Sequence, residues 1–344
     1  MKKIFPEFYN LEQAEIERLW KDCLFVFDAN VLLNLYRYSL ETRENLLSIL
    51  KSFSDRIWVP HQFALEYQRN RMGVIEEQKI KYNKSVNTVI NELENIETLL
   101  KNYFNEPPFD TVKIKEDLIE SQEIFPDCNS DDNIRSQIDE LFTDKIGRSF
   151  EKEKLISIYK DGLERYRKDI PPGYCDAKEK DKEDPTQTRK FGDLVGWLQI
   201  IEKARESRKP IIFITSERKE DWWRKVKGKT VGPRHELVTE FQEGSGQLFY
   251  MYDMERFLSY AKGTHEIDEK TIVEVKKVEE VYNAPLVSEK DPAGYSKALE
   301  AQPEDENIVD SLDTAEPLVV PDIEKESPIL PQVSDSVDSV ETPL

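Results

Sequence analysis

The apolar residues of this chain form short unbroken runs separated by stretches of helical periodicity. The first run, at 24–27, has no polar position and predicts a short strand buried on both faces. Similar runs predict three further strands, at 57–59, 211–215 and 248–252. Helical spacing predicts helices at about 40–50, 61–72, 191–207 and 254–262. Because strands that alternate with helices form parallel sheets, we predict one α/β domain, a three-layer α/β/α sandwich.

A long helical stretch interrupts this alternation. Over residues 75–103 the apolar positions step by seven and then by four and three in turn, which predicts one long helix with an apolar stripe. A second helical region covers about 133–167, and prolines break the chain between the two. We interpret residues 74–168 as an inserted antiparallel helical hairpin. Its stripe fits an internal packing seam better than a dimer interface, and a role as a lid or an arm is left open.

The net charge of −20 is concentrated near the C-terminal end. Residues 263–344 hold 21 acidic and 6 basic residues, which leaves a net charge of −5 on residues 1–262. From about residue 285 the chain is rich in Pro, Ser, Asp and Glu, a composition typical of disorder. We therefore predict a globular domain over 1–262, a linker over 263–284 and a disordered acidic tail over 285–344. The simplest role of the tail is solubility, with a protein partner or mimicry of nucleic acid as alternatives.

The composition also excludes several classes of protein. The chain has no run of 18 apolar residues that would predict a transmembrane helix, and its first 20 residues lack the apolar core of a signal peptide. Three scattered cysteines and three dispersed histidines supply no disulfide framework, zinc site or histidine cluster. We expect a cytoplasmic protein that does not interact with membranes.

Acidic residues recur where the predicted strands end. Asp28 ends the first strand, Glu66 lies in the helix after the second, and Asp193 lies in the first turn of the helix before the third. Glu217 follows the third strand closely, and Asp221 lies four residues further on. Because the carboxyl ends of parallel strands share one edge with the helices that follow, these side chains are expected to converge.

Each of these carboxylates also has a purely structural explanation. Asp28 could cap the next helix, Glu66 could be a surface charge, and Asp193 is favoured by the helix dipole. Together, however, they would repel one another unless divalent cations neutralised them. Oxygen ligands without a Cys or His cluster indicate Mg²⁺ or Mn²⁺ rather than zinc.

Six motifs in a fixed order carry a resemblance to a known family. They are FDANVLLNLYRYS, WVPHQFALEYQRNR, PPGYCDAKEK, RKFGDLVGWLQIIE, KPIIFITSERKEDWW and GPRHELVTEF. Over about residues 20–262 the chain resembles the PIN-like nucleases, and most closely the bacterial PIN-like proteins with a large helical insertion. The resemblance implies a PIN fold and a metal-dependent ribonuclease site. It implies that Asp28, Glu66 and Asp193 are the first three acidic residues of that site, with Asn30 as the accompanying polar residue.

The chain departs from this family after the third strand. Where relatives commonly have an aspartate directly after the threonine of that motif, this chain has Ser216 followed by Glu217. A serine would bind metal weakly or through water, so Glu217 is the candidate ligand here and Asp221 is the second choice. The departure leaves open whether the site holds a second metal ion and is fully active.

A basic segment directly follows this motif. Residues 217–234 contain seven Lys and Arg against three acidic residues, which suits phosphate binding. Trp222 could stack an unpaired base, although large aromatic side chains more often pack in the core. The candidate substrate-binding residues are Asn30, Arg69, Arg71, Ser216, Arg218, Lys219, Trp222 and Arg234.

These observations favour a metal-dependent endoribonuclease that cuts single-stranded RNA. Asp28, Glu66, Asp193 and Glu217, with Asp221 as a further ligand, would hold one or two Mg²⁺ or Mn²⁺ ions that activate water. A role as a toxin or a defence nuclease would suit such an enzyme. The alternatives are a structure-specific DNA nuclease and a catalytically weak module that binds RNA or protein. A phosphatase with an aspartate nucleophile is less favoured, because residue 30 is asparagine where that chemistry usually needs a second acid.

Overall fold

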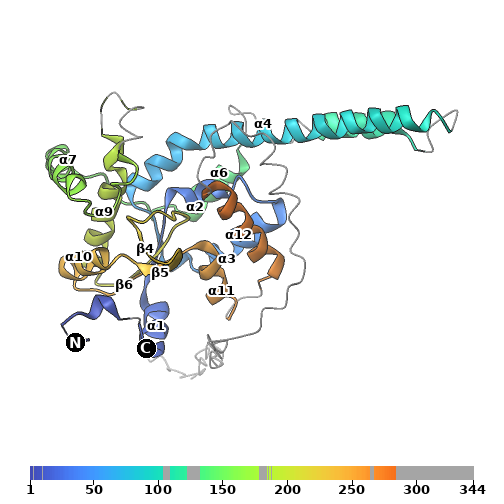
Figure 1. The fold of residues 1–344 in the computed structure, drawn as a ribbon. Coiled ribbons are helices and arrows are strands. Elements are labelled where there is room, and N and C mark those ends of the chain that lie inside the picture. The colour runs from blue at the N-terminus through green and yellow to red at the C-terminus, as the bar shows by residue number, and fades with distance from the viewer. Residues whose placement is uncertain are drawn as a thin grey trace, which may run out of the picture. The chain divides into compact units, whose positions relative to one another are not determined.

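Four parallel strands form the centre of the fold (Figure 1), and they confirm the predicted sheet. They are β1 (Leu24–Phe27), β2 (Ile57–Trp58), β3 (Ile211–Ile214) and β6 (Phe249–Tyr252), in the order β2-β1-β3-β6. Phe27 of β1 pairs with Ile214 of β3, which pairs with Tyr252 of β6, so these three strands end at the same level. Side chains that follow them therefore meet at one edge of the sheet.

The computed structural model describes residues 1–2, 4–9, 11–103, 109–121, 132–177, 184, 186, 188–263 and 267–283. The acidic tail expected from residue 285 lies outside these residues. The helices are α1 (Gln13–Asp22), α2 (Ala29–Asn34), α3 (Leu40–Ser52), α4 (His61–Leu100), α5 (Thr111–Glu120), α6 (Asn133–Leu141), α7 (Lys152–Arg167), α9 (Gly192–Ser207), α10 (His235–Ser245), α11 (Met254–Ala261) and α12 (Glu269–Asn283). Short 3-10 turns are η1 (Pro6–Phe8), η2 (Ser54–Arg56) and η4 (Arg189–Phe191). In the described part of the chain, no helix is long and apolar enough to cross a membrane.

Helices cover both faces of the sheet because neighbouring strand residues point to opposite sides. Phe25 of β1 packs on one layer, with its ring centroid 5.5 Å from that of Phe257 in α11. Phe213 of β3 packs on the other layer, 5.8 Å from the ring of Phe63 in α4. Both strands consist entirely of buried apolar residues. The three-layer α/β/α sandwich predicted from the unbroken apolar runs is confirmed.

A single helix replaces the two that the sequence predicts at 61–72 and 75–103. Helix α4 runs unbroken from His61 to Leu100 and includes Gly73. A glycine inside a helix costs only about 1 kcal/mol relative to alanine, so it need not end the helix. Burial of Val74 and Ile75 continues the apolar face begun by Phe63. The carboxylate at position 66 and the inserted segment therefore belong to one element.

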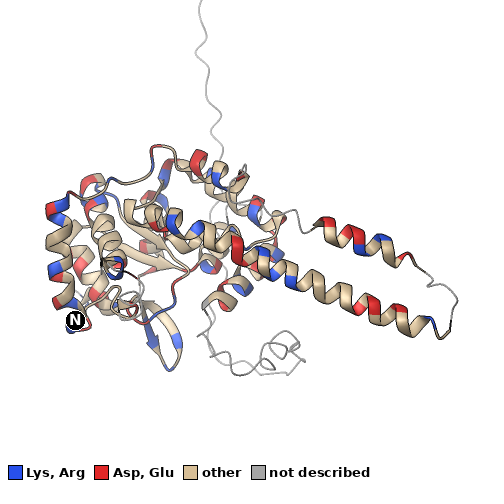
Figure 2. Ribbon diagram, turned by 90° about the horizontal axis from the view of Figure 1, so that it is seen from above, with Lys and Arg blue, Asp and Glu red and all other residues tan. Residues whose placement is uncertain are grey.

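The insertion forms an antiparallel helical pair, but its second helix is not the one that the sequence predicts. The partner of the outer half of α4 is α5, and the two form an arm that carries interspersed charges of both signs (Figures 1 and 2). Region 133–167 instead divides into α6, which packs near α3, and α7, which packs on α9. The apolar stripe predicted over residues 75–103 is only partly covered, because Val86 is buried whereas Ile96 is 40% exposed and Tyr103, just beyond the end of α4, is 82% exposed. The stripe is therefore a packing seam only at its inner end.

The predicted linker over 263–284 is wrong for most of its length. Helix α12 occupies Glu269–Asn283 and packs against α3 and α11. Val275 and Glu279 of α12 are completely buried. Glu274 accepts hydrogen bonds from the backbone of Ser39 and from the hydroxyls of Ser39 and Thr42. The acidic composition of this segment hides an apolar stripe of three- and four-residue spacing, which the sequence analysis missed.

The basic segment forms a two-stranded hairpin that the sequence analysis also missed. Strand β4 (Trp223–Val226) pairs antiparallel with β5 (Lys229–Pro233). The turn consists of Lys227 and Gly228, whose φ angles of 50° and 81° are both positive, as this tight type of hairpin turn requires. Glycine adopts such angles without steric cost, which explains why the chain reverses here.

Candidate active site

Asp28 lies at the shared edge of the sheet, and its side chain does not cap the helix that follows. It occupies the position before the first residue of α2 but makes no side-chain cap hydrogen bond. Instead, its Oδ2 accepts a hydrogen bond from the Thr215 hydroxyl at 2.8 Å and a longer one from the Asn30 amide at 3.4 Å. Thr215 follows β3, so the bond ties the ends of β1 and β3 together.

Asp28 is buried among other acidic side chains. It is 8% exposed. Burial raises the pKa of its carboxyl group to about 7, the Thr215 hydrogen bond opposes this shift, and the charges of Asp193, Glu66 and Glu217 add to it. The carboxylates that the sequence predicts at this edge are therefore close enough to repel Asp28. Their convergence is the central property of the site.

Two glycines make room for the side chains of Glu66 and Asp193. A Cβ atom on Gly192, the first residue of α9, would lie 2.1 Å from Glu66 Oε1. The same carboxylate oxygen accepts a hydrogen bond of 2.8 Å from the Gln62 amide, one helical turn earlier. A Cβ atom on Gly173, whose φ is +93°, would lie 2.9 Å from Asp193 Cβ. Both acidic side chains thus lie against glycines, and the sequence analysis assigned no role to either glycine.

Asp221 is the most buried carboxylate of the cluster, at 1% exposure. Its Oδ2 accepts the backbone N–H groups of Gly173 at 2.9 Å and Cys175 at 3.1 Å. Its Oδ1 is buried and has no hydrogen-bond partner among the described residues. Burial raises the pKa of Asp221, the Cys175 bond lowers it, and the charges of Asp193 and Glu217 raise it further. Asp221 therefore connects segment 171–175 to the acidic cluster and keeps one oxygen available.

Glu217 is held by its own loop. Its Oε1 accepts the backbone N–H groups of Arg218 at 2.8 Å and Lys219 at 3.0 Å. Its Oε2 lies 2.9 Å from the ammonium group of Lys219, which also pairs with Asp176 at 2.7 Å. This carboxylate is close enough to affect Asp28 but is already neutralised, so Asp221 has the more available oxygen of the two.

Ser216, the point of departure from the family pattern, belongs to a different network. Its hydroxyl accepts a hydrogen bond from the Asn34 amide at 3.0 Å and donates one to Glu279 of α12 at 2.9 Å. Ser216 is only 4% exposed, and both roles of its hydroxyl are taken. We therefore remove Ser216 from the candidate substrate-binding residues, because it links β3 to α12 inside the fold.

Several other predicted substrate contacts are also engaged within the protein. Trp222 is 3% exposed and packs on Phe213 and Trp197 with ring centroids 5.2 and 6.1 Å away, so the core interpretation is correct for it. Arg71 is buried against Asp132. Ion pairs also involve Arg218 with Glu279 at 3.5 Å and Arg234 with Glu236 at 2.6 Å.

Two of the predicted substrate contacts stay at the surface. Asn30 and Arg69 are exposed. Arg69 lies on α4 one turn beyond Glu66 and lines a cavity of about 210 Å³ between α4, α7 and α9. Their position beside the cluster leaves them available to a bound molecule.

The donor set fits a hard divalent cation. Within the described ranges, no three His, Cys, Asp or Glu side chains are arranged closely enough to hold an ion by themselves. Mg²⁺, however, usually keeps several waters and binds through one or two carboxylates together with substrate phosphates. Asp28, whose pKa is raised by burial and further by its acidic neighbours, and the unused oxygen of Asp221 are groups that a cation would satisfy.

Comparison with known proteins agrees with this geometry. A family model described as a PIN like domain matches residues 24–237, which is more than half of the chain. No curated protein and no solved structure matches the chain. The matched range contains all five acidic residues of the cluster and the hairpin β4–β5. Helices α11 and α12 lie beyond it.

Proposed function

Because the chain belongs to the PIN-like domain family, we propose that it is a metal-dependent endoribonuclease that hydrolyses phosphodiester bonds in single-stranded RNA. PIN-like domains are generally nucleases and typically use divalent metal ions such as Mg²⁺ or Mn²⁺. The feature that carries the proposal is Asp28, which is buried at the end of β1 and has a pKa raised by burial and by the charges of Asp193, Glu66 and Glu217. So many acidic groups at one strand edge are unfavourable unless cations or substrate phosphates use them.

In this proposal, one or two of the carboxylates of Asp28, Glu66, Asp193 and Asp221 would bind the ion directly, and the others would bind its water molecules. Thr215 fixes the orientation of Asp28, and Gln62 fixes that of Glu66. A bound Mg²⁺ or Mn²⁺ ion would supply Lewis acidity toward the attacking water and the scissile phosphate. Exposed Asn30 and Arg69 would position the substrate beside the cluster. Water attack in line with the leaving oxygen would leave a 5′-phosphate and a 3′-hydroxyl.

A second candidate is a PIN-like module that binds RNA but cuts it poorly. The observation that favours it lies in the motif after β3, where the acid that is usual in the family is replaced by Ser216. The Ser216 hydroxyl is already hydrogen-bonded to Asn34 and Glu279. Glu217 is also paired with Lys219. A site with fewer available ligands would hold its metal ion more weakly.

The test is cleavage of a labelled single-stranded RNA by the purified full chain with and without Mg²⁺ or Mn²⁺. We expect cleavage that requires the ion and is lost in Asp28→Asn and in Asp193→Asn. Asp161→Asn, which removes an exposed carboxylate from α7, is the matched control and should cut like the parent.

Three results would contradict the proposal or narrow it. Undiminished cleavage by both site variants would show that the acidic cluster is not the active site. RNA binding without ion-dependent cleavage would favour the binding module. Faster cleavage of single-stranded DNA or of DNA flaps than of RNA would favour a DNA nuclease.

A further inference from the structure

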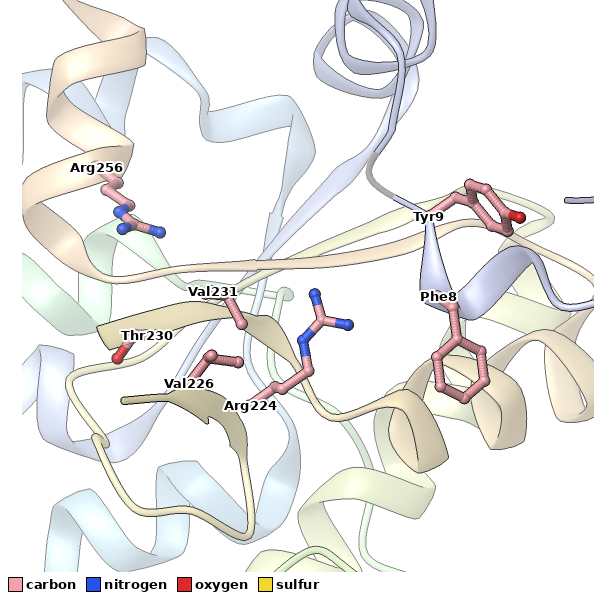
Figure 3. Close-up of a pocket in the computed structure, with 7 residues that line it drawn as sticks. All are labelled: Phe8, Tyr9, Arg224, Val226, Thr230, Val231 and Arg256. Carbon is pink, nitrogen blue, oxygen red and sulfur yellow. The ribbon is translucent and has the colours of Figure 1, made fainter. Parts of the chain in front are cut away.

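A groove lies beside the hairpin β4–β5, away from the residues assigned to the reaction (Figure 3). It has a volume of about 690 Å³, and its walls include Arg224 of β4, Arg256 of α11 and the aromatic residues Phe8 and Tyr9 near η1. Figure 3 shows the guanidinium group of Arg224 between the hairpin and these aromatic residues. Cations and exposed rings thus share one open surface.

We propose that this groove and the hairpin tip bind the backbone and bases of the single-stranded RNA substrate outside the scissile phosphate. This inference rests on the proposed function and adds a second binding surface to it. The base of the hairpin is anchored to the acidic loop, because the indole N–H of Trp223 donates to the carbonyl oxygen of Glu217. Arg224 also follows Asp221 by only three residues in the sequence. An RNA strand bound at the acidic cluster can therefore reach the hairpin.

The positive charge of the hairpin favours RNA as its ligand. Residues 222–233 contain four cations, Arg224, Lys225, Lys227 and Lys229, and no acidic residue, in a chain with a net charge of −20. The three lysines are exposed, and none forms an ion pair with a described carboxylate. Figure 2 shows the hairpin carrying basic segments only. Such uncompensated cations repel one another, and phosphates of a nucleic acid would relieve that repulsion.

His235 holds Arg224 at the wall of the groove. His235 Nδ1 lies 2.6 Å from the carbonyl oxygen of Glu7, so this nitrogen carries the proton and donates it. The Nε2 atom is then the acceptor for the Arg224 guanidinium group. The ring of Phe8 stacks on His235 with centroids 4.0 Å apart. Arg224 is thus fixed at the groove wall by a ring nitrogen and not by a described carboxylate, which leaves its positive charge for a ligand.

Two exposed aromatic side chains border the groove. Phe8 is 57% and Tyr9 is 44% exposed although both border the groove. One face of Phe8 is covered by His235, so Tyr9 is the better platform for a base. Single-stranded nucleic acids are bound in this way, with phosphates on cations and bases on aromatic rings. An anionic membrane surface could also use exposed rings beside lysines, and the test includes it.

Binding of a labelled single-stranded RNA of about 20 nucleotides to the full chain, measured by fluorescence anisotropy in EDTA, tests the proposal without cleavage. The variant Lys225→Ala/Lys227→Ala/Lys229→Ala is expected to bind about tenfold more weakly. A plot of the logarithm of the binding constant against the logarithm of the salt concentration has a negative slope. The magnitude of this slope should decrease by about 2, because each of the three lost phosphate contacts contributes about 0.7. Tyr9→Ala should weaken binding by about fivefold or more through lost stacking.

Matched controls come from the arm. Lys84→Ala/Lys101→Ala/Lys113→Ala removes the same charge from exposed positions, and Tyr103→Ala removes an aromatic residue that is 82% exposed. Both are expected to bind RNA like the parent. Equal binding by the hairpin variant, by Tyr9→Ala and by the parent would overturn the proposal. An equal loss in the arm controls would overturn it too, because it would show a general effect of charge.

Failure of this proposal can be separated from failure of the proposed function. If ion-dependent cleavage requires Asp28 but the triple-lysine variant of the hairpin and the parent bind RNA equally, only RNA binding by the groove is excluded. If RNA binding depends on the hairpin but the protein does not cleave RNA with either ion, the binding proposal is supported and the nuclease proposal is contradicted. Binding of vesicles rich in phosphatidylserine at least as tightly as RNA, with the same hairpin dependence, would overturn the choice of RNA.

Discussion

Thr215 connects two acidic positions that are almost 190 residues apart in the chain. Its hydroxyl donates to Asp28 Oδ2 at 2.8 Å and accepts the backbone N–H of Glu217 at 2.9 Å. The hydroxyl therefore sets the distance between the strand-end carboxylate and the loop that follows β3. A buried carboxylate with this single strong partner retains a raised pKa, since one hydrogen bond does not offset its desolvation.

The pKa of Asp28 makes the stability of the metal-free protein depend on pH. Its pKa rises from 3.8 to about 7 on folding, so between these values the folded chain keeps a proton that the unfolded chain releases. The free energy of unfolding therefore falls as pH rises through this window. Asp28→Asn should flatten this dependence and make the protein more stable than the parent at pH 7 in EDTA. Urea unfolding of both proteins at several pH values measures the difference.

A constant difference between the two proteins at all pH values would contradict this account. Glu279, whose pKa is also raised to about 7, contributes a slope of the same sign. That slope is present in both proteins and cancels in the comparison.

Gly192 controls the position of Glu66. In Gly192→Ala the new methyl group would collide with the end of a flexible side chain, so we expect Glu66 to move while the fold is kept. Cleavage should fall by about tenfold or more, since small displacements at a reacting centre are costly. Gly73→Ala is the control, because a Cβ there meets nothing within 4 Å. It should raise stability by about 0.5–1 kcal/mol and leave cleavage unchanged. Equal activity of both variants would exclude the positioning role.

At the scale of elements, α12 is an integral part of the domain. It lies beyond the family match at 24–237, yet Glu279 bonds to Ser216 in the loop that carries Glu217. The guanidinium carbon of Arg37 lies over the ring of Tyr282, 3.8 Å from the ring centroid. The same guanidinium group donates a hydrogen bond to Asn34. The serine that replaces the usual acid is thus matched by an acid from α12. In this chain that position serves to attach a helix.

Burial of Val275 provides a direct measure of this attachment. Val275→Ala should lower the free energy of unfolding by about 2 kcal/mol, because it removes buried apolar groups. Val273→Ala changes the same residue type in the same helix at a position that is 58% exposed, and it should have little effect. Urea unfolding measures both. Similar small effects at the two positions would mean that α12 is not packed in solution.

At the scale of the whole molecule, residues 263–344 carry most of the net charge of −20, and residues 1–262 carry −5. Repulsion between like charges works against the compact state. The acidic cluster at the sheet edge adds to this repulsion locally. An ion bound there would therefore stabilise the entire domain.

We expect Mn²⁺ or Mg²⁺ to raise the free energy of unfolding by about 2.7 kcal/mol when its concentration is 100 times the dissociation constant. Stabilisation should be lost in the double variant Asp28→Asn/Asp193→Asn and kept in Asp161→Asn. Chemical unfolding with increasing ion concentration measures it. If the double variant is stabilised as strongly as the parent, the ion binds elsewhere on the protein.

The sequence by itself determined the sheet and the place of the site. Unbroken apolar runs have no polar face to present to water, so the four strands are central and parallel. Because parallel strands end at one edge, the sequence predicts that Asp28, Glu66 and Asp193 lie near one another. The motif resemblance added the family, and the match over 24–237 agrees with it.

Only the tertiary structure decided which partners these residues use. Nothing local distinguishes a basic residue paired with a distant acid, such as Arg71 with Asp132, from an exposed one such as Lys227. The bonds of Ser216 to Asn34 and Glu279 likewise join segments far apart in the chain. Periodicity reports how a segment is buried, whereas the identity of its neighbours depends on how all segments pack. The acidic cluster was therefore predictable from the sequence, while the state of Glu217, the role of α12 and the groove were not.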